Sequence, residues 1–233
     1  MGMVIFERSG TFDPTVFGLV AGDVLQVICV GGGSSGDGVT GVGSKATKVS
    51  GIAGGTSAFG NYISSDDGYI MGRGGESHVS TDSTQHAYSA GGAGGYLPGI
   101  PMFGGNGGYG FTTPASGLGG QGGYSNTSPS PLCNVRGDGN KGAGYGRAYA
   151  TNSSAVGGAG GNGYGAGGGG VAYLSNNDYV VSGNGGDAGK YMLGTVILPN
   201  LYQIAVTVGA GGASVGADYA SGRGADGVVI VTW

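Results

Sequence analysis

The sequence predicts a mainly β and irregular fold: a polyglycine II helix bundle clamped by short β-strands from both termini. Three observations predict it. Glycine makes up 61 of the 233 residues, apolar segments typical of strands lie towards both ends, and the glycines between them recur at every third position. Ordinary proteins contain about 7% glycine, so this chain has few side chains with which to build an ordinary core. α-Helices are not expected, because a glycine costs about 1 kcal/mol in a helix interior.

Short strands are expected at both edges of the chain. At the N-terminal edge, three segments are rich in β-branched and aromatic residues: VIFERSGTFD (4–13), VFGLV (16–20) and DVLQVICV (23–30). Near the C-terminus, LYQIAVTVG (201–209) alternates apolar and polar side chains, as a half-buried strand does. The last segment, GVVIVTW (227–233), is apolar on both faces, so we expect a buried strand.

These segments predict one glycine-rich domain that spans 1–233. Strands from about 3–30 and 195–233 are expected to form its base, and about 31–194 and 209–227 the polyglycine II body with its loops.

Between the strands the glycine spacing has a period of three, as in Gly183, Gly186 and Gly189. This is neither the period of a strand nor that of an α-helix. It matches the polyproline II helix, which has three residues per turn and no internal hydrogen bonds. Neighbouring helices must then pair each other's N–H and C=O groups, and glycine lets the backbones approach closely. We expect a bundle of at least six such helices, with glycine in place of side chains where they touch.

A single glycine run cannot offset the free-energy cost of its own ordering. Fixing one residue costs about 1–2 kcal/mol, whereas an intramolecular hydrogen bond contributes only about 0.5–1.5 kcal/mol net. Only a bundle can therefore be ordered. A collagen helix is set aside, because the chain has 7 prolines and no unbroken Gly-X-Y tract. A flexible glycine linker is the remaining alternative; the aliphatic strands and the tyrosines between the runs oppose it.

Charge and motif content argue against several classes of function. Charged residues are 9% of the chain and the formal net charge is −4, which provides no basic surface for nucleic acid or for a membrane. No apolar run reaches the ~20 residues of a membrane-spanning helix. The two histidines, His78 and His86, lie in a polar segment without a third ligand, so we expect no metal site. No cofactor and no enzymatic activity are expected, and Cys29 and Cys133 are expected to be unpaired thiols.

The two ends of the chain carry a resemblance. They read SGTFDPTVFGLVAGDVLQVICVGGG (9–33), then YQIAVTVGAGG (202–212) and GADGVVIVTW (224–233). This frame resembles the glycine-rich domains that close many bacteriophage tail-fibre proteins. The GGx repeats between them are similar to those of the host-recognition adhesins at the tips of T-even-type long tail fibres. The resemblance implies a glycine-rich sandwich of polyglycine II helices, whose variable loops at one end contact a receptor on the bacterial surface.

Two functions follow from this resemblance. The first is a virion adhesin of the tail fibre that is made in the host cytoplasm, binds an outer-surface protein or glycan, and contacts other fibre proteins. The second is a purely structural virion part, such as a fibre, baseplate or capsid decoration domain, that binds no receptor. An adhesin should block phage adsorption when added as free protein, and a decoration protein should not.

Counting runs backward from Trp233 predicts which loops face a partner, if successive runs alternate in direction. The count places the loops 96–103, 124–136, 171–182 and 213–221 at the distal end, and those at 111–116 and 147–156 at the base. It becomes ambiguous before Gly91, so 61–71 is left unassigned.

Each distal loop contains tyrosine, which supplies a large amphipathic contact at low entropic cost. The alternative is that these tyrosines pack over the ends of the bundle. The candidate receptor-binding residues are Tyr96, Tyr124, Tyr173, Tyr179, Tyr219, Asn176, Asn177, Asp178 and Asp218.

Overall fold

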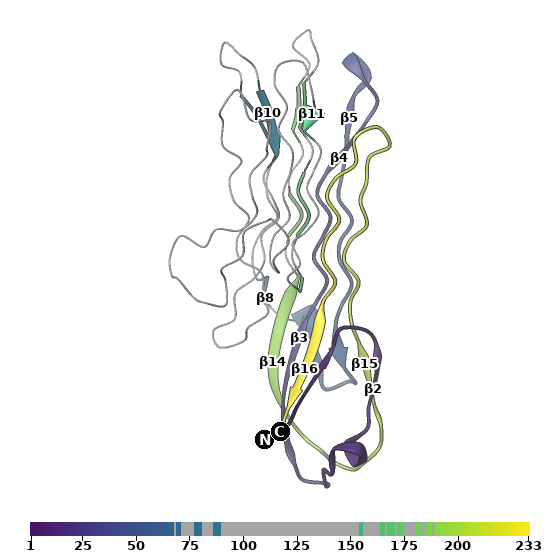
Figure 1. Ribbon diagram of the computed structural model, residues 1–233, viewed down its shortest axis with the longest axis vertical. Helices are drawn as coiled ribbons and strands as arrows, with labels where there is room; N and C mark the ends of the chain where they lie inside the picture. The colour runs from purple at the N-terminus through teal and green to yellow at the C-terminus, as the bar shows by residue number, and fades with distance from the viewer. Residues whose placement is uncertain are drawn as a thin grey trace.

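The computed structural model describes residues 1–67, 69–70, 77–80, 86–89, 154–155, 164–165, 167–170, 172–174, 180–182, 185–187 and 189–233. Over these ranges the protein is mainly β and contains no α-helix, as the glycine content predicts. None of its described helices is long and apolar enough to cross a membrane. Figure 1 shows an elongated molecule: both termini and two β-sheets lie towards one end, and the strands β4, β5, β10 and β11 lie towards the other.

Two antiparallel sheets form the end that carries the termini, which we call the base. The first has the order β1 (Met3–Phe6), β16 (Val228–Thr232), β3 (Val24–Val30) and β14 (Lys190–Ile197), with the short β8 (Tyr69–Ile70) beside β14. The second has the order β2 (Gly10–Phe12), β15 (Ile204–Thr207), β6 (Ala58–Phe59) and β7 (Ile63–Ser64).

A side-chain core fills the base, although the glycine content suggested too few side chains for an ordinary core. Phe12 and Phe59 are fully buried, with ring centroids 5.5 Å apart in an edge-to-face arrangement. The glycines are concentrated elsewhere in the chain, so the base keeps enough apolar residues for a core. Its other buried members include Leu25, Val27, Cys29, Val196, Leu198, Ile204, Val206, Val229 and Val231.

Both C-terminal strand predictions are confirmed in part: β15 occupies 204–207 of the predicted 201–209, and β16 occupies 228–232 of the predicted 227–233. Tyr202, expected on the apolar face, precedes β15 and is exposed. In β15, Ile204 and Val206 are buried and Ala205 and Thr207 are exposed, as the alternation predicts. In β16, all residues from 228 to 231 are buried, because they pack on both faces of the first sheet.

The predicted strand 16–20 is wrong. A 3₁₀ helix, η1 (Pro14–Phe17), begins there, since Asp13 accepts hydrogen bonds from the backbone N–H and the hydroxyl of Thr15 and Pro14 occupies the first turn. Hydrogen bonds from Thr15 and Gln203 lower the pKa of Asp13. The helix ends at Gly18, whose φ of 69° is left-handed and suits glycine.

The base also extends further into the chain than expected. β14 begins at Lys190 instead of near 195, and it pairs with the whole of β3. The segment 58–64, which the sequence assigns to the body, forms the β6–β7 hairpin beside β15. Phe59 anchors this hairpin in the core. The unassigned segment 61–71 thus contributes β7, the 3₁₀ helix η3 (Ser65–Asp67) and β8 to the base.

Beyond the sheets the backbone continues as extended runs that lie side by side (Figure 1). We call the described runs together the column. Those that lead away from the base are 31–37, 165–170 (without 166) and 209–215; those that return are 51–57, 185–189 (without 188) and 222–227.

The run 31–37 shows how the column is connected. The N–H groups of Gly31, Gly32 and Gly33 donate to carbonyl oxygens of three different neighbours, and the next three residues repeat this order. The donor directions therefore have a period of three. The bonds, at 2.8–3.1 Å, are Gly31 to Lys190, Gly32 to Gly55, Gly33 to Ala225, Ser34 to Asp187, Ser35 to Ile52, and Gly36 to Gly222.

Short strands lie at the end opposite the base (Figure 1). The His78–His86 segment is a hairpin of β9 (Ser77–Ser80) and β10 (His86–Ser89), not a loop throughout. The other strands there are β4 (Gly38–Thr40) with β5 (Thr47–Val49), joined through the 3₁₀ turn η2 (Gly43–Lys45), and the sheet of β11 (Ser154–Ala155), β12 (Ala172–Leu174) and β13 (Val180–Ser182).

Candidate functional site

The candidate site lies at the end of the column and combines the β4–β5 hairpin, 38–49, with the loop 213–221. We call these two segments the tip. Their backbones are paired: the N–H of Val39 donates to the carbonyl of Tyr219 at 3.0 Å, and the N–H of Tyr219 donates to the carbonyl of Val39 at 3.1 Å. The predicted distal loop 213–221 therefore lies at the end of the column that faces away from the base.

Polar side chains hold the two tip segments together. Oδ2 of Asp218 accepts a hydrogen bond of 2.7 Å from the N–H of Gly41, and Oγ1 of Thr40 accepts one of 3.0 Å from the N–H of Ala217. Gly41 and Gly216 have φ angles of 89° and 98°, which suit glycine at these sharp turns. Asp218 thus fixes the loop geometry while its side chain stays exposed.

Tyr219 packs within the tip. Its half-buried side chain covers Val39 and Ala46, which are both fully buried. At this position the structure supports the alternative that the sequence left open, in which a tyrosine covers the end of the bundle.

Two exposed side chains of the tip are ones that sequence reasoning missed. Val42 is 58% exposed at the turn of the hairpin, and the neighbouring Lys45 is exposed with no ion pair among the described residues. Lys48, by contrast, pairs with Asp37 at 3.4 Å. A signal was present, because GVT and TKV flank a glycine-containing turn and favour a short hairpin.

The remaining candidate residues fall in two groups. Tyr173 lies in β12, where its backbone pairs with Ser154 and Val181. The placement of the loop 147–156 at the base is wrong, because Ser154 pairs with Tyr173. The strands β12 and β13 of the loop 171–182 lie at the end opposite the base, as predicted (Figure 1). The count of glycine runs does not detect β11, because this strand of two residues contains no glycine. Lying outside the described residues are Tyr96, Tyr124, Tyr179, Asn176, Asn177 and Asp178.

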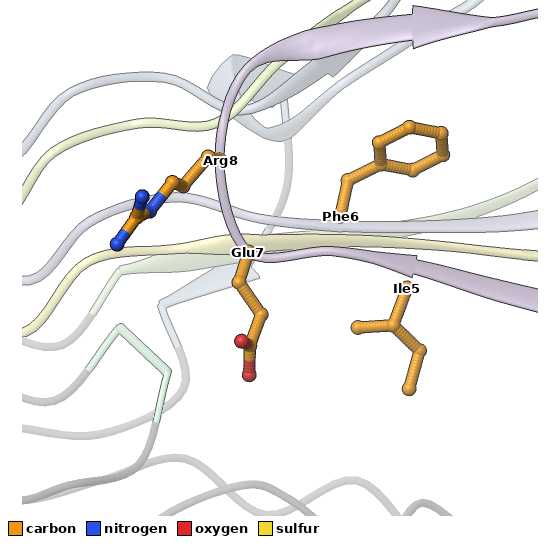
Figure 2. A pocket seen from close by; sticks show the side chains of 4 residues that line it. All are labelled: Ile5, Phe6, Glu7 and Arg8. Atoms are coloured by element: carbon orange, nitrogen blue, oxygen red, sulfur yellow. The ribbon is translucent and has the colours of Figure 1, made fainter.

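The base carries a second feature, an open hollow of about 570 Å³ beside β1 (Figure 2). Its described lining consists of Ile5, Phe6, Glu7 and Arg8. The hydroxyl of Tyr164 donates a hydrogen bond to Oε1 of Glu7. Burial, together with the hydrogen bond and negative charge of Glu7, raises the pKa of Tyr164.

The described residues hold no group of three or more histidine, cysteine or acidic side chains that could bind a metal ion. Comparison with protein-family models, with curated proteins and with solved structures finds no match.

Proposed function

We propose that the runs of the column are polyglycine II helices, packed as a glycine-rich sandwich on the β base. The donor directions in 31–37 support this, because a helix with three residues per turn sends every third N–H towards the same neighbour. Its carbonyls also accept: Gly212 donates to Gly33 at 2.8 Å, and Gly168 donates to Ser34 at 2.9 Å. The run thus bonds to all five of the other described runs.

These five runs also bond to one another around 31–37. Four hydrogen bonds of 2.7–2.9 Å each join two runs that lie next to each other around the central run. This is the arrangement expected when helices with parallel axes pack closely. They run from Gly55 to Ala210, from Gly224 to Gly212, from Gly222 to Gly169 and from Gly186 to Gly168.

Close approach explains why glycine occupies the shared faces. A Cβ atom on Gly224 would overlap the carbonyl oxygen of Gly33, and one on Gly189 would overlap that of Gly31. Positions that face outward carry side chains instead, as Ile52 and Ala53 do in the run 51–57. The period of three in the sequence is thus the period at which a helix meets a neighbour.

On this architecture we infer a bacteriophage tail-fibre adhesin whose tip contacts a bacterial outer-surface protein or glycan. The observation that carries the inference is the polarity of the molecule. The termini pair with each other at the base, through hydrogen bonds of 2.8 and 3.0 Å between Gly2 and Trp233, while the tip lies at the far end (Figure 1). A fibre that holds the base would present the tip to the host.

The tip offers a contact surface of mixed chemistry. Val42 contributes exposed apolar area and Lys45 a positive charge that has no ion pair in the described part of the chain, while Asp218 and Tyr219 fix the loop beside them. The predicted contact residues in 96–103, 124–136 and 171–182 remain part of the proposal. The protein would be made in the host cytoplasm and assembled into the virion with other fibre proteins.

Adsorption competition tests the proposed function. Purified protein added to host bacteria before the phage should slow phage adsorption in a dose-dependent manner, because it occupies the receptor. Adsorption that is unchanged at saturating protein, with the protein present in purified virions, would instead establish the purely structural virion role.

A further inference from the structure

β1 is an edge strand of the first sheet, and half of its backbone groups point away from that sheet. Gly2 and Trp233 exchange two hydrogen bonds, so the antiparallel alternation directs the N–H and C=O groups of Val4 and Phe6 towards β16. The groups of Met3 and Ile5 point outward and have no partner in the described part of the chain. Such groups are a template for one more strand.

The hollow beside β1 lies along this free edge. Consecutive residues of a strand point to opposite faces, and Figure 2 shows Phe6 on one side of the backbone with Ile5 and Glu7 on the other. The described lining, Ile5, Phe6, Glu7 and Arg8, comes from both faces of the strand, and β16 occupies the inner edge, so we place the hollow along the outer edge. About 570 Å³ is room for a segment of a few residues.

The side chains at this edge define what would fit there. Ile5 and Phe6 are half-buried and apolar, one on each face of the strand. Arg8 is exposed and forms no ion pair within the described ranges, whereas the carboxylate of Glu7 is engaged by Tyr164. The complement is therefore an extended segment with apolar side chains opposite Ile5 and a carboxylate within reach of Arg8.

We propose that an extended, acidic segment of the virion protein that carries this chain adds to the first sheet as a strand beside β1. Strand addition of this kind takes its affinity from main-chain hydrogen bonds and its specificity from flanking side chains. The proposal rests on the proposed function, since it names how the adhesin is held. It places the attachment at the base and leaves the tip free for the receptor.

A second copy of this chain fits the same edge less well. β1 runs from the base towards the tip, because it is antiparallel to β16, which returns from the run 222–227. Antiparallel pairing of two β1 strands across a twofold axis would point the two columns in opposite directions. One tip of each pair would then face away from the host.

The test compares incorporation into virions with binding to cells. Ile5→Pro removes the outward N–H of residue 5 without removing a bond to β16, and edge strands tolerate proline. Ile5→Ala removes the same side chain but keeps the N–H and is the matched control. We expect at least a tenfold loss of Ile5→Pro protein from purified virions, measured by immunoblot, with near-normal incorporation of Ile5→Ala and similar melting of both.

Charge reversal provides a second variant that keeps the strand backbone intact. Arg8→Glu should also reduce incorporation at least tenfold, whereas Lys45→Glu, the same reversal at the tip, should leave incorporation unchanged. Free Arg8→Glu protein should still bind host cells as the wild type does. Normal incorporation of both Ile5→Pro and Arg8→Glu would overturn the strand-addition proposal, and failure of the free wild-type protein to bind cells would overturn only the adhesin.

Discussion

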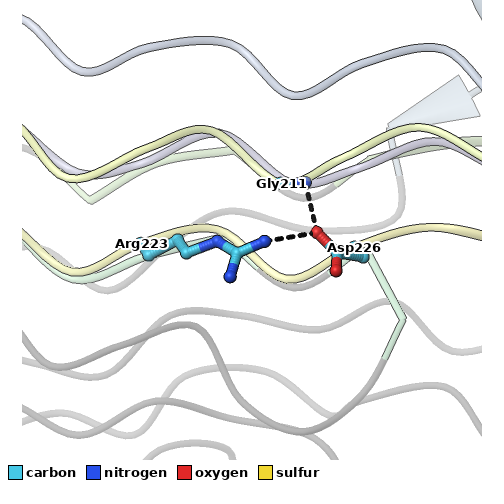
Figure 3. A network of polar contacts seen from close by, with 3 residues as sticks. All are labelled: Gly211, Arg223 and Asp226. Atoms are coloured by element: carbon cyan, nitrogen blue, oxygen red, sulfur yellow. Dashed lines mark hydrogen bonds and ion pairs between the residues drawn. The ribbon is translucent and has the colours of Figure 1, made fainter.

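The backbone N–H of Gly211 donates a hydrogen bond of 2.8 Å to Oδ1 of Asp226 (Figure 3). The same oxygen accepts a bond of 2.6 Å from the guanidinium of Arg223. A side chain therefore pairs with a column N–H that has no backbone acceptor among the described residues. Both ionic side chains are about half exposed, so the ion pair itself contributes little to stability.

Replacing Asp226 separates the backbone bond from the ion pair. Asp226→Ala leaves the N–H of Gly211 without its acceptor and should lower the free energy of unfolding by about 1–2 kcal/mol. Asp226→Asn keeps an oxygen acceptor and Arg223→Ala keeps the carboxylate, so each should cost about 0.5 kcal/mol. Urea denaturation measures all three; equal losses for Asp226→Ala and Arg223→Ala would show that the ion pair matters instead.

A single methyl group tests the close packing of the column. Gly224→Ala places a Cβ against the carbonyl oxygen of Gly33, so the two runs must separate, at a cost of about 3 kcal/mol or more. Gly10→Ala in β2 is the control, because its Cβ would lie 3.8 Å from the ring of Phe6, an ordinary contact. Thermal unfolding that is the same for the two variants would contradict the packed column.

Ser57 links the base to the column through a fully buried hydroxyl. Its Oγ accepts a bond of 2.9 Å from the N–H of Gly209, and its own N–H donates to Oγ of Ser65 at 2.9 Å. Ser57→Ala should cost about 1–3 kcal/mol of unfolding free energy, since Gly209 is buried. Ser64→Ala, which removes only an exposed bond to the N–H of Asp66, should cost about 0.5 kcal/mol or less; comparable losses would argue against the buried link.

Burial raises the pKa of the Cys29 thiol to about 12. The thiol should therefore resist iodoacetamide in the folded protein at pH 8 and react in urea, with peptide mass spectrometry locating the label. Because the folded pKa lies above the unfolded one, the thiol's contribution to stability is present below pH 9 and is lost as the pH rises towards 12. Alkylation of Cys29 in the folded protein at pH 8 would contradict its burial.

Two exposed valines at opposite ends of the molecule test the tip as the contact surface. Val42→Asp should weaken binding of the free protein to host cells at least tenfold, because it puts a charge in the apolar part of the tip. Val16→Asp is the control, since Val16 is 74% exposed in the base. Flow cytometry of labelled protein measures both, and equal binding by the two variants would remove Val42 from the contact surface.

The apolar strands could be predicted from sequence because each repeats a pattern over several residues, as Ile204 and Val206 do in β15. Ala58–Phe59 could not, since a strand of two residues has no period and Phe59 is buried through tertiary contact alone. The strand predicted at 16–20 is wrong because local capping by Asp13 and Gly18 outweighs the β propensity of Val16 and Phe17.

The candidate site was predictable only where the glycine pattern was regular. The loop with Asp218 and Tyr219 follows the run at Gly209–Gly212, and the structure brings it to the tip. The hairpin at 38–49 was missed because the count of alternating runs is ambiguous before Gly91, although the flanking runs 31–37 and 51–57 contain four and three glycines. A run can carry side chains wherever it faces away from its neighbours. Counting glycines alone can therefore miss a run, and the count then assigns the wrong direction to the runs beyond it.

Electron microscopy of virions tests the adhesin account most directly. Gold-labelled antibody fragments raised against the β4–β5 hairpin, 38–49, should bind at the free ends of the tail fibres, furthest from the virion body. The antibody binds the tip, so a label there reports both the location of the protein and its orientation. Gold over the capsid or the baseplate, with the fibre ends unlabelled, would contradict the account.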